Sequence, residues 1–247
     1  MPTNCTNLSP GVSIVIVSAH ESHRLLSTLR SIPSNVHNLE VILVVPKSDT
    51  GAQAIVNESG YLGISIYNDL GRGVYQAMTI GLSRAIHTHI LFLNTGDRLI
   101  GLDQLMHCFS EIEKDPTVAY IFPIEASWSD DLTSSLPDLR KFLAGEKGSY
   151  VSHQGVLFLK AFLSQEGRFD ERFKIAADYK QLCSLYYTRN YLTLNSKLVS
   201  IEYPTISAKF NRRGRIETIL IAFFYLKGFL RLRALANRAK KEVHDLL

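Results

Sequence analysis

Short apolar runs alternate with amphipathic helical patterns through the first half of the sequence, and this alternation limits the available folds more than any other feature. Runs rich in β-branched residues, which are typical of buried strands, occupy residues 12–17, 40–45, 62–67 and 90–93. Apolar residues at helical spacing occupy residues 22–32, 52–59 and 74–86. Repeated strand–helix–strand units favour right-handed crossovers, so we expect an α/β, Rossmann-like fold with a mainly parallel sheet flanked by helices.

The second half of the sequence follows this rhythm less closely. A helix is predicted at residues 102–114 and a strand at 118–124. Residues 127–148 lose the pattern, which indicates a variable loop or a lid. Beyond them, an apolar segment, a helix and one or two strands are predicted at residues 151–159, 175–187 and 192–203.

Residues 69–97 form the most informative stretch of the chain. Gly71 and Gly73 flank Arg72 in a loop, an amphipathic helix and an apolar strand follow, and the turn after the strand ends in Asp97. This order places a carboxylate at the carboxyl end of a buried strand, where open α/β sheets bind ligands. We therefore predict that Asp97 lies in the functional site.

Positive charge is concentrated near the end of the chain. Residues 207–247 hold ten Lys or Arg against three Asp or Glu, whereas residues 1–206 hold seventeen against twenty. The apolar segment at 216–230 contains Lys227 and is shorter than the roughly 20 residues that span a bilayer. We predict a body at 1–206 and a basic amphipathic helical tail at 207–247. The tail either associates with an anionic membrane surface or packs on the body or at a homo-oligomer interface.

The sequence also indicates the compartment and excludes one class of partner. Cys5, Cys108 and Cys183 are far apart and form no metal-ligand spacing, which favours a reducing compartment. The polar residues 1–11 lack the apolar core of a signal peptide. We expect a cytoplasmic protein, peripheral at the inner face of the cytoplasmic membrane. The negative balance of the body argues against a nucleic-acid partner.

Four stretches together resemble family 2 glycosyltransferases of the GT-A fold, and most of all the bacterial subgroup that builds surface polysaccharides. They are VSIVIVSAHESHRLLSTLRSI, DLGRGVYQAMTIGLSRAIHTHILFLNTGD, SHQGVLFLK and GRFDERFKIAADYKQL, at residues 12–32, 69–97, 152–160 and 167–182. No single motif is conclusive, but their order and spacing are specific. The resemblance implies that residues 1–206 form a GT-A domain that binds a nucleotide-sugar donor and a saccharide or lipid-linked saccharide acceptor.

The resemblance assigns two carboxylates to the chemistry. The family's metal motif has two Asp residues around one position, and here it reads Asn94-Thr95-Gly96-Asp97, so Asp97 alone corresponds to a strong ligand. Mn²⁺ or Mg²⁺ bound there would neutralise the leaving diphosphate. Asp178 resembles the general base of an inverting transfer. The alternatives are a turn-forming Asp97 and an Asp178 that only stabilises a helix N-terminus.

Four residues are candidates for binding the donor. The resemblance implies that Asp69 contacts the nucleotide or its sugar, and Arg72 between two glycines is suited to a phosphate. Asp49 is a candidate substitute for the acid that the family carries at the end of the second strand, which is missing near Val45. Glu21 lies in the first loop, where the sequence also departs from the family pattern. A turn-forming Asp69 and a solvated Arg72 are the alternatives.

The remaining candidates are His153 and Gln154, which contact the acceptor or the diphosphate, or else belong to the packed core. Together these assignments predict an inverting, metal-dependent glycosyltransferase for surface polysaccharide synthesis. The altered base-binding loop leaves a second hypothesis open. This is a degenerate, non-catalytic module that binds a nucleotide or a protein partner at the membrane.

Overall fold

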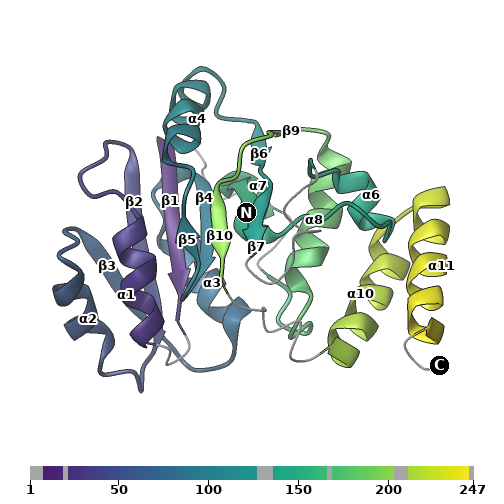
Figure 1. The fold of residues 1–247 in the computed structure, drawn as a ribbon, viewed down its shortest axis with the longest axis horizontal. Coiled ribbons are helices and arrows are strands. Elements are labelled where there is room, and N and C mark those ends of the chain that lie inside the picture. Colours follow the sequence, from purple (N-terminus) through teal and green to yellow (C-terminus); the bar gives the residue numbers. More distant parts are fainter. Residues whose placement is uncertain (1–7, 19–21, 127–135, 166–168, 203–210, 245–247) are drawn as a thin grey trace.

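The structure, a computed structural model, describes residues 8–18, 22–126, 136–165, 169–202 and 211–244. A seven-stranded sheet crosses the molecule in the order β3-β2-β1-β4-β8-β6-β9, with helices on both faces (Figure 1). Its strands are β1 (Ser9–Val17), β2 (Leu39–Pro46), β3 (Ile64–Asp69), β4 (His87–Asn94), β6 (Ala119–Ile121), β8 (Val156–Leu159) and β9 (Tyr191–Thr193). A smaller sheet has the order β5-β10-β7 and consists of β5 (Arg98–Leu99), β7 (Ile124–Ala126) and β10 (Val199–Ile201).

The helices divide between the two faces of the large sheet. One core contains residues of α1 (Ser22–Ser31), α2 (Ala52–Ser59) and α4 (Leu102–Lys114). The other core contains residues of α3 (Val74–Arg84), α6 (Leu139–Leu143), α7 (Lys160–Gln165), α8 (Ala177–Thr188), α10 (Asn211–Tyr225) and α11 (Gly228–His244). Alternate side chains of β1 supply both cores, since Ile14 and Ile16 belong to the first and Val15 and Val17 to the second.

Strands β1 to β4 pair in parallel, as the sequence predicted. Their carboxyl ends therefore lie at one edge of the sheet, where Val17 of β1 pairs with both Val44 and Asn94. Pro46 of β2 pairs with Asp69 of β3 at the same edge. Beyond β4 the sheet is mixed, because β8 runs antiparallel to β4 and β6.

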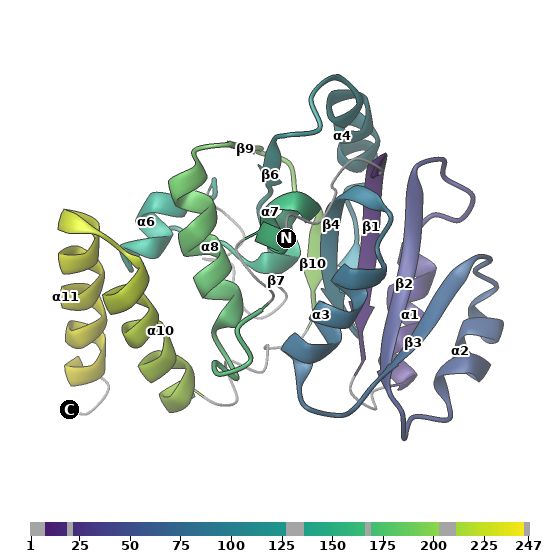
Figure 2. The same cartoon turned by 180° about the vertical axis from the view of Figure 1, so that it is seen from behind.

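Gly81 allows α3 to lie close to the sheet, on the face that Figure 2 shows. A Cβ atom at this position would lie 2.2 Å from Cγ1 of Val15, well inside van der Waals contact. Any larger residue would therefore force α3 or β1 to move. The glycine thus permits close packing of α3 on the sheet.

The strand predicted at 118–124 is wrong as a single element. Strand β6 joins the large sheet and β7 joins the small one, and Pro123 lies between them. Proline has no N–H to continue a ladder, so the chain leaves one sheet here and enters the other. The loop predicted at 127–148 contains the short helix α6, which Asp138 caps by accepting a hydrogen bond from Lys141 N at 2.9 Å. Residues 127–135 lie outside the described residues.

The C-terminal segment is helical, as predicted, and it forms two helices. Helix α10 ends at Tyr225, and α11 begins at Gly228 with φ of 53°. In both views α10 lies between α8 and α11, at the end of the molecule away from β3 (Figures 1 and 2). Buried apolar side chains hold the pair against the body, namely Ile221, Ala222, Leu226 and Ala234.

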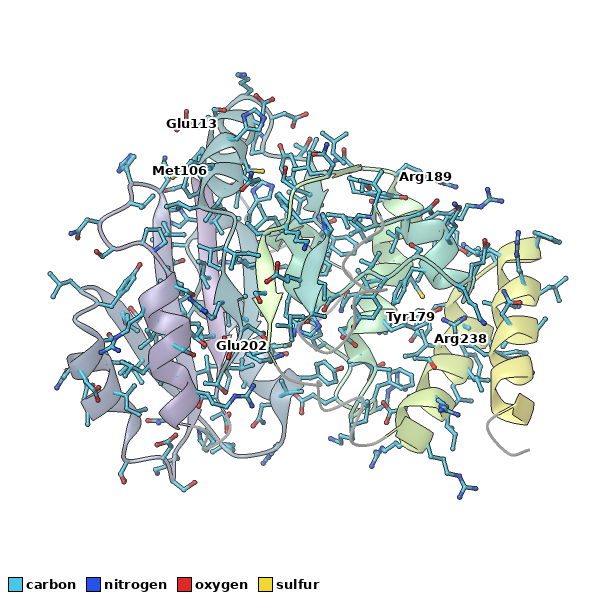
Figure 3. The ribbon with its side chains drawn as sticks, in the orientation of Figure 1. Met106, Glu113, Tyr179, Arg189, Glu202 and Arg238 are labelled. Atoms are coloured by element: carbon cyan, nitrogen blue, oxygen red, sulfur yellow. The ribbon has the colours of Figure 1, made fainter. Side chains whose placement is uncertain are left out.

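Arg238 makes two of the polar contacts between α11 and the body. Its guanidinium donates to the carbonyl oxygen of Leu143 at 3.0 Å and to the hydroxyl of Tyr179 at 2.7 Å (Figure 3). The inner sides of α10 and α11 are thus part of the folded core. Within the described ranges, no helix combines the length and the apolar character needed to cross a membrane.

Candidate active site

The turn after β4 holds the carboxylate of Asp97 in a fixed orientation. Asn94 N donates to Asp97 Oδ2 at 2.7 Å, and Asp97 N donates back to Asn94 O at 3.0 Å. Gly96 has φ of 98°, and its N–H donates to Thr28 Oγ1 at 2.8 Å. A Cβ at Gly96 would lie 2.3 Å from the guanidinium of Arg24, so only glycine allows α1 to pack against this turn.

Asp97 is buried, with 3% of its surface exposed. Burial raises the pKa of Asp97 from 3.8 to about 6, although the hydrogen bonds from Asn94 and Gln154 act to lower it. The second of these bonds runs from Gln154 Nε2 to Asp97 Oδ2 over 3.2 Å. A buried carboxylate that resists ionisation gains from a nearby cation, so this environment suits a charge-neutralising ligand.

Asp178 lies in the first turn of α8, as the sequence predicted. Its Oδ1 accepts a hydrogen bond from Tyr179 N at 2.8 Å, and its Oδ2 lies 2.9 Å from Nδ1 of His153. Burial acts to raise the pKa of Asp178, but the hydrogen bonds from His153, Tyr75 and the Tyr179 N–H hold it below its usual range. Asp178 is therefore ionised at neutral pH, which is the state that a general base requires.

Adjacent residues of one 3-10 turn, η1 (His153–Gly155), connect the two carboxylates. His153 contacts Asp178 and Gln154 contacts Asp97. The turn packs closely against the chain just before β7. A Cβ at Gly155 would lie only 2.6 Å from the carbonyl oxygen of Phe122. The structure thus brings four predicted residues into one hydrogen-bonded network.

His153 and Gln154 are buried, which agrees with the alternative that they are packed core residues. Both side chains nevertheless point polar groups at carboxylates. Nε2 of His153 is buried and has no hydrogen-bond partner in the described part of the chain. Since an unpaired buried polar atom costs free energy, this nitrogen is a candidate contact for a bound ligand.

Tyr75 belongs to the site but received no role from the sequence. Its hydroxyl donates to Ile175 O at 2.6 Å and lies 3.0 Å from Asp178 Oδ1. Burial raises the pKa of Tyr75, so the hydroxyl stays protonated. Tyr75 lies within residues 69–97, one of the stretches that carry the resemblance, but nothing in the sequence indicated that α3 and the start of α8 would meet at this hydroxyl.

Two of the predicted donor-binding residues, Asp69 and Asp49, lie in neighbouring loops at the same sheet edge. Asp69 ends β3, is buried, and accepts a hydrogen bond from Gly71 N. Asp49 follows β2, and its Oδ1 accepts from Gly51 N at 3.0 Å, while its buried Oδ2 has no hydrogen-bond partner among the described residues. The two loops are tied together because Lys47 N donates to Asp69 O at 3.1 Å.

Arg72, a third donor candidate, lies in the loop before α3. Arg72 is exposed and lines a small hollow between the start of α3 and the loop before α8, together with Gln76, Glu171 and Lys174. Glu21 lies outside the described residues.

The donor set at Asp97 fits a hard divalent cation only if the cation has additional ligands. Asp97 offers carboxylate oxygen, which Mg²⁺ and Mn²⁺ prefer. No group of three or more His, Cys, Asp or Glu suited to a metal occurs in the part of the chain that the structure describes. A cation here would need oxygens from a phosphate or from water, and Mg²⁺ commonly binds in this way.

Comparison with known proteins identifies the family. The model of the family described as glycosyltransferase like family 2 matches residues 10–186. The chain belongs to this family. The match makes it an enzyme of the glycosyltransferase class, and it covers the segments that carry Asp97, His153, Gln154 and Asp178. No curated protein matches the sequence.

Solved structures of glycosyltransferases share the fold of this family 2 chain. TarS 1-349 from S. aureus in complex with UDP is 13% identical, with a TM-score of 0.66 over 95% of this chain and 72% of that one. The same TarS fragment is also known in complex with UDP-GlcNAc. The mannosyltransferase PcManGT from Pyrobaculum calidifontis, in complex with GDP-Man and Mn²⁺, is 15% identical, with a TM-score of 0.62 over 97% of this chain and 78% of that one. These likenesses confirm the expected GT-A fold.

Proposed function

We propose that the protein is an inverting, metal-dependent glycosyltransferase of surface polysaccharide synthesis. It moves a sugar from a nucleotide-sugar donor to a lipid-linked saccharide at the inner face of the cytoplasmic membrane. The observation that carries this proposal is the pair of carboxylates, Asp97 buried and Asp178 half-buried, joined through one turn. Burial raises the pKa of Asp97, whereas hydrogen bonds lower the pKa of Asp178. Carboxylates whose environments separate their pKa values have separate roles in catalysis.

Asp178 has the features of the general base. An acceptor hydroxyl attacks the anomeric carbon of the donor, and its proton passes to a carboxylate oxygen of Asp178 as the carbon–oxygen bond forms. The bond between the anomeric carbon and the diphosphate oxygen breaks on the opposite face, which inverts the configuration. His153 and Tyr75 hold the carboxylate in place through contacts at 2.9 and 3.0 Å, respectively.

Asp97 has the features of the ligand for the cation. When bound, Mn²⁺ or Mg²⁺ supplies positive charge that stabilises the leaving diphosphate. Gln154 and the N–H of Asn94 fix the orientation of the Asp97 carboxylate, and burial makes it favourable for the carboxylate to gain a cation. The structurally similar PcManGT is known in complex with Mn²⁺, and this supports the assignment.

The donor is proposed to lie along the edge formed by the ends of β2 and β3. Asp69 and the unpartnered Oδ2 of Asp49 are available there for the nucleoside or its sugar. Arg72 is proposed to meet a phosphate. The similar structures hold UDP, UDP-GlcNAc and GDP-Man, which supports a nucleotide-sugar donor but does not select one base.

The outer faces of α10 and α11 support the membrane part of the proposal. Phe224, Phe229 and Leu232 are each exposed by more than 60%. On α10 the exposed apolar residues recur at helical spacing, and the full outer stripe comprises Ile216, Leu220, Phe223, Phe224, Phe229 and Leu232. Arg231 lies over the ring of Phe223, 5.8 Å from its centroid, so positive charge adjoins the stripe. An apolar stripe beside basic residues suits the interface of an anionic bilayer.

Donor hydrolysis and transfer test the enzymatic proposal. Wild-type protein with Mn²⁺ and a panel of nucleotide sugars should release nucleoside diphosphate, and Asp97→Ala should lose most of this activity. Glu113→Gln is a matched control, because it removes an exposed carboxylate on α4 (Figure 3). An inert wild type on the whole panel would instead favour the non-catalytic module.

Co-sedimentation with anionic vesicles tests the membrane proposal. Replacing Phe224 and Phe229 with serine should weaken binding at least about tenfold, because each buried Phe side chain contributes about 1.5–3 kcal/mol. The control replaces Leu102 and Met106, two exposed apolar residues of α4, with serine. Equal sedimentation of both variants would contradict a membrane role for the stripe. Deleting α10 and α11 would be a poorer test, since it would uncover the core.

A further inference from the structure

Helix α10 presents one buried carboxylate to the segment just before α8. Glu217 is only 6% exposed and accepts hydrogen bonds from three consecutive backbone N–H groups. Lys174 N donates to Oε1 at 3.0 Å, and Ile175 N and Ala176 N donate to Oε2 at 2.8 and 3.0 Å. A side chain of the C-terminal helix pair thereby fixes the backbone of residues 174–176, which lie 43 to 41 positions earlier in the chain.

These three N–H groups belong to the residues just before the first turn of α8, whose N-cap is Ala176, and the alanine side chain cannot accept a hydrogen bond. Glu217 therefore fixes the chain where it enters the helix. Glu217 provides negative charge close to the positive end of the helix dipole. Arg213 Nε lies 2.9 Å from Oε1. Burial acts to raise the pKa of Glu217, but Arg213 and the three N–H groups hold it below its usual range.

The same segment leads directly into the helix turn that carries the proposed base, Asp178. Ile175 O accepts the hydrogen bond from Tyr75, whose hydroxyl also lies 3.0 Å from Asp178 Oδ1. Asp178 itself follows Ala176 by two residues. Gly214 allows α10 to approach this segment, because a Cβ there would lie 3.0 Å from Cγ2 of Ile175.

We propose that Glu217 is a positioning residue of the transfer reaction: it fixes the backbone of residues 174–176 and, through it, Asp178 and Tyr75. This inference rests on the proposed function, in which Asp178 is the base. It makes α10 a part of the catalytic framework as well as a surface helix. Residues 1–206 alone would then contain every catalytic side chain but would lack the group that holds the base in place.

Steady-state kinetics with Glu217→Ala and Glu217→Gln test the proposal. A displacement of the base by about 1 Å can cost up to about 100-fold in rate, so we expect kcat per folded enzyme to fall about 10- to 100-fold for Glu217→Ala. The KM for the donor should change less than about threefold, since the variant leaves Asp97 and Asp69 in place. Glu217→Gln keeps one acceptor oxygen and should lose less activity than Glu217→Ala.

Glu146→Gln is the matched control. It breaks the ion pair between Arg233 of α11 and Glu146, whose N–O distance is 3.3 Å, and so loosens the same helix pair at a different place. The control should retain kcat. If Glu217→Ala lowers the melting temperature but leaves kcat per folded enzyme unchanged, Glu217 is structural only and the proposal is overturned.

Hydrogen exchange gives a second readout that needs no activity. In Glu217→Gln, the amides of residues 174–178 should exchange faster than in wild type, while those of β2 should be unchanged. Unchanged exchange at 174–178 would overturn the proposal. If the wild type transfers no sugar, the proposed function fails, and the exchange result alone then decides whether Glu217 fixes the segment. Asp178→Asn should lower the transfer rate at least about 100-fold while keeping the exchange protection.

Discussion

Replacing Asp97 with asparagine should stabilise the metal-free protein at neutral pH while removing its function. Asparagine has the shape of the protonated acid, and its side-chain oxygen still accepts from Asn94 N and Gln154 Nε2. The charge that burial disfavours is gone. Functional sites commonly hold groups of this kind, which reduce the stability of the fold in exchange for activity.

The size of the effect follows from the pKa of Asp97. Burial raises this pKa from 3.8 to about 6, and each pH unit between the two values corresponds to about 1.4 kcal/mol, so the ionised wild type is destabilised by about 3 kcal/mol. The folded protein binds the proton more tightly than the unfolded chain. The stability that the neutral acid provides is therefore lost as pH rises from 3.8 to about 6.

Urea unfolding with EDTA present measures this difference. At pH 7.5 we expect Asp97→Asn to be more stable than wild type by about 3 kcal/mol, and at pH 5 by about half as much, because the wild type is then largely protonated. Mn²⁺ at 100 times its Kd should stabilise the wild type by about 2.7 kcal/mol and should leave the variant unchanged.

Glu113→Gln serves as the control, because this carboxylate is exposed and its loss should alter stability by less than about 0.5 kcal/mol. The reasoning is refuted if Asp97→Asn is no more stable than wild type at pH 7.5, or if its gain is the same at both pH values. The first result would mean that Asp97 is not held in an unfavourable charged state. The second would mean that the gain has a cause other than charge.

Three further predictions concern the core and the base. Gly81→Ala should lower the free energy of unfolding by at least about 1 kcal/mol in urea titrations, because its Cβ would overlap Val15 and overpacking costs about 1–3 kcal/mol; an unchanged midpoint would contradict this. Asp178→Asn should lower kcat about 10²- to 10⁴-fold with little change in the donor KM, as measured by diphosphate release; near-normal kcat would exclude it as the base. His153→Phe should raise the pKa of Asp178, so the acidic limb of the kcat–pH profile should move to higher pH. An unmoved limb would show that His153 does not control the ionisation of Asp178.

The parallel half of the fold was predictable because its signals are local. The helix predicted at 102–114 has the observed bounds of α4, and each apolar run before it became a strand within a few residues of its predicted ends. The division at Pro123 was missed. The chain contributes three residues to one sheet before Pro123 and three to the other sheet after it, and nothing in the apolar pattern marks the boundary. The break between α10 and α11 was missed because the apolar pattern continues across Lys227.

The site was predictable only in part, because its contacts join distant segments. Asp97 and Asp178 stood out as acids at a strand end and a helix start. Their link through adjacent residues of η1 depends on how β8 pairs with β4, which the sequence does not show. The role of Glu217 was hidden for the same reason, since its three N–H partners lie about forty residues earlier.

The link between the carboxylates through His153 and Gln154 makes this turn intolerant of changes in length. One inserted residue lengthens an extended chain by about 3.3–3.6 Å, more than either hydrogen bond can absorb. Gly155 packs directly against the backbone of Phe122, which leaves no room there for an additional residue. Substitutions at this turn can therefore differ in the size of their effect, whereas a single insertion or deletion would break the connection between Asp97 and Asp178. Chimaeras between related enzymes should keep this tripeptide whole and place their junctions elsewhere.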